Sequence, residues 1–183
     1  MQVEFVGYAA DCVIAGEVAL ASDRLTDLLT GTDEYDVVNV TLEVLDDTRI
    51  LSLETVKILR EDLCLVAATG PRGNAGRRVR TRPHPMLARV GPYEVFGFIH
   101  ALPTADPVTA ALRRSIIPMT SGWIRYRRGG ELVERRHDGM LVNRAQIVWL
   151  EQATNEDALL PKALELPIAI NSGAKDLTGE IYV

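Results

Sequence analysis

The chain has 183 residues, enough for one ordinary domain or two small ones. With 47% hydrophobic and 25% charged residues it has the composition of a globular protein, which argues against wholesale disorder. No apolar run approaches the roughly 18 residues needed to span a membrane, and acids stand where a signal peptide would carry lysines, so we expect a cytoplasmic protein.

The net charge of −5 is distributed unevenly along the chain. Residues 1–68 carry a net charge of −10, residues 69–91 carry +6 without any acid, residues 92–150 carry +3, and the remainder carries −4. Such asymmetry concerns partners rather than fold. Cys12 and Cys64 are the only cysteines, and both lie in apolar runs. We interpret them as small buried hydrophobes, because two cysteines do not make a disulfide framework.

An internal repeat with a period near 82 residues organises the chain. Residues 13–20, 95–102 and 177–183 resemble one another, and their glycines stand at positions 16, 97 and 179, spacings of 81 and 82. These segments alternate like strands. A constant spacing is harder to obtain by chance than any single local match, so we interpret the segments as copies of one strand.

The elements that follow each of the first two glycine strands agree in order. A short helix is predicted at 22–29, where leucines recur at helical spacing, and at 105–112, where an aspartate cap precedes Pro107. Hairpins follow, turning at residues 46–47 and at Gly129-Gly130. Strand–turn–strand segments at 56–66 and 140–150 close the units and align Arg60 with Arg144.

A unit of roughly 60 residues with five short strands buries a core best by curling its sheet into a small barrel. We therefore predict a mainly β protein with short helices, built from two tandem small β-barrels of the SH3-like or Sm-like kind. The barrels should span residues 1–68 and 86–152, joined by a basic linker at 69–85. The extension 153–183 should carry the first strand of a third repeat, and we expect residues 177–183 to add to a sheet edge of the same or a neighbouring chain.

Apolar residues at the strand positions of each unit are expected to form the core. In the first unit these are Leu20, Val40, Leu42, Ile58, Leu63 and Leu65, and in the second Leu102, Trp123, Val142, Ile147 and Trp149.

The closing segment Leu-Val-Asn-Arg-Ala-Gln-Ile-Val-Trp-Leu at 141–150 resembles the second signature of Sm-like proteins, in which two hydrophobic strands flank a tight polar turn. The chain departs from that family because its helical segment follows the glycine strand instead of preceding the first strand. The unit is also similar to uncharacterised bacterial domains with an L-x-D-L-L helix and a V-N-R-x-x-I-V-W-L ending. The resemblance implies a small barrel, and it implies no RNA-binding residues because the lysine–histidine turn is absent.

Arginines provide the candidate binding residues. They are Arg72, Arg77, Arg78, Arg80 and Arg82 in the glycine-rich linker, and Arg125, Arg127 and Arg128 in the second unit. The linker lacks the G-K-[ST] ending of a nucleotide-binding loop, so it is a soluble connector, a phosphate contact or a docking segment for an acidic protein face. Trp123 and Tyr126 are interleaved with the arginines of the second unit, and their rings could stack on the bases of single-stranded RNA. One face of such a strand, however, normally packs in the core.

The sequence predicts no catalytic, metal or cofactor site. His84, His100 and His137 lack metal-ligand spacing, and the acids at 33–36 lack the pattern of a calcium loop. We therefore predict a non-catalytic assembly or protein-binding module whose repeats associate with other chains, including copies of itself. The alternative is a protein that binds single-stranded RNA through the arginine-rich linker and the second unit.

Overall fold

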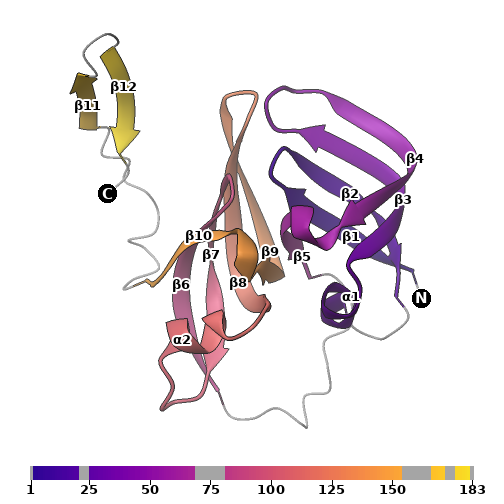
Figure 1. The fold of residues 1–183 in the computed structure, drawn as a ribbon, viewed down its shortest axis with the longest axis horizontal. Helices are drawn as coiled ribbons and strands as arrows, with labels where there is room; N and C mark the ends of the chain where they lie inside the picture. Colours follow the sequence, from indigo (N-terminus) through magenta and orange to yellow (C-terminus); the bar gives the residue numbers. More distant parts are fainter. Residues whose placement is uncertain (1, 21–24, 69–80, 154–165, 172–175, 182–183) are drawn as a thin grey trace. The chain divides into compact units, whose positions relative to one another are not determined.

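The computed structural model describes residues 2–20, 25–68, 81–153, 166–171 and 176–181 (Figure 1). It divides into two compact units, Met1–Gln152 and Ala153–Val183, and each is described by itself. Within the described ranges, no helix has the length and the apolar character needed to cross a membrane.

The first unit is an antiparallel sheet of ten strands, so the predicted mainly β class is confirmed. Its first half, here called repeat 1, contains β1 (Gln2–Ala9), β2 (Cys12–Ala19), α1 (Leu25–Gly31), β3 (Glu34–Val44), β4 (Ile50–Leu59), the 3₁₀ turn η1 (Arg60–Asp62) and β5 (Leu63–Ala67). Its second half, repeat 2, contains β6 (Arg82–Val90), β7 (Tyr93–Ala101), α2 (Pro107–Leu112), β8 (Ile116–Arg128), β9 (Glu131–Asn143), η3 (Arg144–Gln146) and β10 (Ile147–Gln152).

The two repeats share one topology. The strand order is β5-β1-β2-β3-β4 in repeat 1 and β10-β6-β7-β8-β9 in repeat 2. A helix follows the second strand of each, and a 3₁₀ turn that begins at Arg60 or Arg144 precedes the last strand. The predicted duplication is confirmed at the level of strand order. The glycine strand is nevertheless the second strand of each repeat and not the first element as predicted, since β1 and β6 precede it. Residues 82–85, which were expected in the linker, lie in β6.

The period-82 glycines lie at equivalent bulges. Gly16 pairs with Phe5 and Gly97 with Met86, and at each glycine the register with the following strand shifts by a residue. Opposite the bulges stand Asn39 and Ser121 with φ of 53° and 50°. A Cβ atom on Gly16 would lie 2.7 Å from the carbonyl oxygen of Val38, so the bulge brings two backbones too close for any side chain.

Strand pairing crosses between the repeats. β5 pairs with β9 in the register Leu65–Val142, Val66–Leu141 and Ala67–Met140, which makes the ten strands one continuous open sheet. The described strands therefore form one open sheet and not two clearly separate barrels. One edge strand of each repeat, β5 or β9, pairs with the edge strand of the other repeat. This pairing supplies hydrogen-bond partners to backbone groups that a separate barrel would pair by closing its sheet.

Two hydrophobic cores lie on opposite faces of the shared strands. Leu65 and Val142 belong to the core of repeat 2, whereas Val66 and Leu141 belong to the core of repeat 1. Both faces of β5 are therefore buried, as its all-buried residues show.

Most of the predicted core is confirmed. The buried members are Leu20, Val40, Ile58, Leu63, Leu65, Trp123 and Val142, and Leu42 and Ile147 are partly buried. The predictions for Leu102 and Trp149 are wrong, because these side chains are 48% and 40% exposed. Leu102 lies just beyond the end of β7, and Trp149 lies on the outermost strand β10.

The second unit contains a hairpin of β11 (Leu166–Asn171) and β12 (Asp176–Ile181). Ile168 pairs with Gly179, eleven residues later, just as Phe5 pairs with Gly16 and Met86 with Gly97. The glycine strand is thus the second strand of this hairpin, not the first strand of a third repeat as predicted. Pro167 in β11 and two prolines in β6 obscured the preceding strand in the sequence.

Candidate interaction surface

The predicted arginines do not form one patch. Arg72, Arg77, Arg78 and Arg80 lie outside the described residues, and Arg82 is exposed at the start of β6. Arg125 is only 7% exposed. Its Nε donates to Glu134 Oε2 at 2.8 Å, and its guanidinium lies 4.2 Å from the ring centroid of Trp123. The Nη1 atom of Arg127 donates to the carbonyl oxygen of Gly130 at 3.0 Å, so both side chains make contacts within the chain.

Charged groups from the two repeats meet at Glu43 of β3. Its carboxylate accepts hydrogen bonds from Nη2 of Arg135 at 2.7 Å and from Nη1 of Arg128 at 3.4 Å, both from repeat 2. Nη2 of Arg128 also donates to the carbonyl oxygen of Thr48. Part of the charge asymmetry, which the sequence suggested for an external partner, is therefore used to join the repeats.

An aromatic cluster lies beside this ion-pair group. The rings of Tyr8, Tyr93 and Tyr126 meet edge to face at centroid distances of 5.4 to 6.2 Å, and the Tyr8 hydroxyl lies 2.7 Å from Nε2 of His137. Burial raises the pKa of each of the three phenols, and burial together with Arg135 lowers the pKa of His137. These groups are therefore neutral near pH 7, which suits their packing in the buried contact between the repeats, because burial disfavours charge.

The two thiols are also neutral. Cys64 is completely buried, and burial raises its pKa to about 11. Burial and the neighbouring Asp11 raise the pKa of Cys12 to about 12. Because the thiolate is the reactive form, neither cysteine is set up as a nucleophile.

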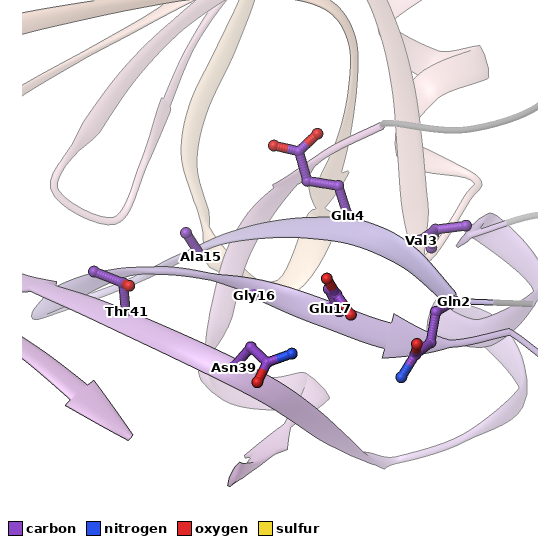
Figure 2. A pocket seen from close by; sticks show the side chains of 8 residues that line it. All are labelled: Gln2, Val3, Glu4, Ala15, Gly16, Glu17, Asn39 and Thr41. Atoms are coloured by element: carbon purple, nitrogen blue, oxygen red, sulfur yellow. The ribbon is translucent and has the colours of Figure 1, made fainter. Parts of the chain in front are cut away.

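A shallow hollow of about 570 Å³ lies over the bulge of repeat 1, lined by Gln2, Val3, Glu4, Ala15, Gly16, Glu17, Asn39 and Thr41. Figure 2 shows these side chains around Gly16. In repeat 2 the positions equivalent to Ala15 and Thr41 hold Phe96 and Trp123, whose rings stack 5.8 Å apart. The hollow thus exists because repeat 1 has small side chains where repeat 2 has rings.

The remaining polar candidates do not converge. His100 lies against Thr120, with 2.9 Å between Nε2 and Oγ1, and His137 lies against Tyr8. Among the described residues, no three His, Cys, Asp or Glu side chains gather closely enough to hold a metal ion.

The outer strand β10 presents the feature that most resembles a binding surface. Of the described strands, only β6 pairs with it, and Val148 and Trp149 are 70% and 40% exposed. Their equivalents in repeat 1 follow from the shared register. Cys64 and Val148 are each the bulged residue of their strand, so Leu65 corresponds to Trp149.

The two equivalent pairs have opposite environments. Cys64 and Leu65 are buried at 0% and 1% exposure in the core of the following repeat. Val148 and Trp149 are also apolar, but within the described part of the chain no strand covers them. This surface could not be predicted from apolar character alone, because the alignment of residues 64–65 with 148–149 pairs two equally apolar segments.

This chain matches no known family model, no curated protein and no solved structure.

Proposed function

We propose that this protein is a non-catalytic assembly module that binds other polypeptide chains by adding a strand to the outer edge of β10. The observation that carries the proposal is the exposure of Val148 and Trp149, compared with the burial of Cys64 and Leu65 at the same positions of repeat 1. In repeat 1 such an edge is covered by a strand of another repeat.

The chemistry of β10 suits strand addition. An outer strand offers backbone amides and carbonyls to a partner, and soluble proteins commonly protect such edges with lysine or proline. The sequence of β10, Ile-Val-Trp-Leu-Glu-Gln, contains neither. Main-chain hydrogen bonds would supply affinity, while burial of Val148 and Trp149 would select the partner's apolar side chains.

Each repeat is, in the same proposal, a small barrel of the SH3-like or Sm-like kind that opens to pair with its neighbour. Support comes from the five-strand order common to both repeats and from the 3₁₀ turn that precedes each last strand.

Sedimentation velocity of the 183-residue chain tests the proposal. Wild type should associate as its concentration rises by pairing of two β10 edges, and V148K/W149K should remain monomeric because its lysines would be buried at that contact. Leu132→Lys is the matched control, since Leu132 is 63% exposed on β9 away from that edge. A wild-type chain that is monomeric at all concentrations would contradict the proposal for copies of the chain.

Binding of single-stranded RNA stays a prediction and is the rival function. It depends on Arg72, Arg77, Arg78 and Arg80, outside the described residues, and on Arg82, which is exposed. The arginines of β8 favour it less, because Arg125 and Arg128 are engaged by Glu134 and Glu43. An electrophoretic shift with single-stranded RNA at moderate salt separates the two functions, and no shift at micromolar protein would remove the rival.

A further inference from the structure

We propose, building on the function above, that the β10 edge accepts a strand like β9 from a further copy of this repeat, and that the β4 edge is capped against the same contact. Assembly would then extend the sheet in one direction only.

The junction between the repeats shows what the added strand must supply. Leu141 of β9 and Ile116 of β8 pack into the core of repeat 1, although both belong to repeat 2. The Nδ2 atom of Asn143 donates to the carbonyl oxygens of Leu63 at 2.9 Å and Arg60 at 3.3 Å. The partner therefore contributes two apolar side chains and one amide.

The equivalent positions of repeat 1 follow from the strand register. Glu34 pairs with Leu59 as Ile116 pairs with Asn143, and Asp36 pairs with Lys57 as Pro118 pairs with Leu141. The positions of Ile116, Leu141 and Asn143 are thus occupied in repeat 1 by Glu34, Lys57 and Leu59.

These three replacements prevent β4 from acting as β9 does. Lys57 Nζ lies 3.0 Å from Glu34 Oε1, and each side chain is 57% exposed. Strand addition would bury this ion pair in an apolar core. The cost of removing both charges from water would exceed the gain from their attraction. The side chain of Leu59 also has no amide to donate. A polar outer face of this kind is what a terminal repeat of an array needs.

At the opposite edge, β10 presents the apolar side chains of Val148 and Trp149 instead of an ion pair. On β10, Ile147 and Leu150 pack against the core of repeat 2. Val148 and Trp149 are exposed instead, at the positions whose equivalents in repeat 1 are buried in the core of the next repeat. The β11–β12 hairpin repeats the pairing of β1–β2 and β6–β7, so the pattern of the repeat continues past Gln152. A further repeat is therefore the partner whose chemistry this edge fits.

The test gives the β4 edge the junction residues of repeat 2 and measures whether that edge then binds the β10 edge of the wild-type chain. A partner variant carries E34I/K57L/L59N, which copies the junction residues of repeat 2, together with V148K/W149K, which closes its own β10 edge. Mixed with the wild-type chain, it should form a one-to-one complex in sedimentation velocity. The matched control carries E34K/K57E with V148K/W149K, which keeps a reversed ion pair at the cap, and it should not bind.

Two further variants test register and direction. Leaving the Leu59→Asn substitution out of the partner variant should weaken the complex about tenfold, the effect of one well-made buried hydrogen bond. The triple variant E34I/K57L/L59N with an unaltered β10 edge should form open head-to-tail polymers, because its two ends are then complementary and their contact is heterologous.

The outcomes separate this inference from the proposed function. If the partner variant has wild-type circular dichroism yet does not bind, while wild type still associates through Val148 and Trp149, then strand addition holds and the specific partner is wrong. If the partner variant binds equally well to V148K/W149K, the contact is elsewhere and the inference is overturned. If neither wild type nor the partner variant associates with wild type, both proposals fail.

Discussion

The side-chain amide of Asn143 donates a 2.9 Å hydrogen bond to the carbonyl oxygen of Leu63, 80 residues earlier in the chain. This bond lies in the buried junction where β9 of repeat 2 meets the first residue of β5. The Oδ1 atom of Asn143 also accepts a hydrogen bond from the backbone N–H of Ala145. One side chain therefore orients η3 and binds the neighbouring repeat.

Replacing Asn143 with alanine should lower the free energy of unfolding by about 1–3 kcal/mol, because the buried carbonyl of Leu63 would lose its donor. Urea unfolding followed by circular dichroism measures this. Gln146→Ala is the control, since that amide donates to Glu61 at an exposed site and its loss should cost less than about 1 kcal/mol. Equal losses for the two variants would show that the junction bond has no special weight.

Gly122→Ala should be the most damaging glycine substitution in the bulge of repeat 2. A Cβ atom there would lie 1.9 Å from the carbonyl oxygen of Phe96 and 2.9 Å from Cα of Gly97, so backbone must move. We expect a loss of about 3 kcal/mol or more, measured by thermal unfolding. Gly31→Ala, where nothing lies within 4 Å, should be neutral or stabilise α1 by up to about 1 kcal/mol.

Stability should fall as the pH is lowered through the range in which free histidine titrates. Burial and Arg135 hold the pKa of His137 below its ordinary value of 6.5 in the folded protein. Below about pH 6.5 the unfolded chain therefore binds a proton that the folded chain does not, which favours unfolding, and above that pH the effect vanishes.

The measurement is the free energy of unfolding at about pH 7.5 and about pH 5.5 for wild type and His137→Gln, one pH on either side of the free histidine value. The variant should lose part of the pH dependence. Identical slopes for wild type and His137→Gln would contradict the role assigned to His137.

Glu43→Gln should weaken the joint between the repeats. Its carboxylate is the shared acceptor of Arg128 and Arg135, and the three side chains are 19% to 33% exposed. We expect a loss of about 1–2 kcal/mol at low salt, reduced at high salt because partly exposed charges are screened. Glu131→Gln on the exposed hairpin of β9 should change stability by less than about 0.5 kcal/mol. A loss that does not depend on salt would indicate packing rather than charge.

The amino-acid sequence alone was enough to predict the features that depend on local backbone geometry. The repeat of Gly16 and Gly97 was readable because each stands at a bulge with little room for a side chain: a Cβ atom would lie 2.7 Å from the carbonyl oxygen of Val38 at Gly16, and 3.1 Å from the side chain of Met140 at Gly97. The polar turns at Arg60 and Arg144 were readable because a 3₁₀ turn interrupts two apolar runs in the same way in both repeats.

Which strand edges have partners became evident from the three-dimensional fold and not from the sequence. Cys64-Leu65 and Val148-Trp149 are equally apolar in sequence, yet the first pair is buried in the core of repeat 2 and the second is exposed. Likewise Glu34 and Lys57 read as ordinary surface residues until the register of β3 with β4 aligns them with Ile116 and Leu141. An apolar pattern indicates that a side chain favours burial. It does not indicate which distant strand will bury that side chain, because strands pair through backbone hydrogen bonds that nearly all residue types make alike.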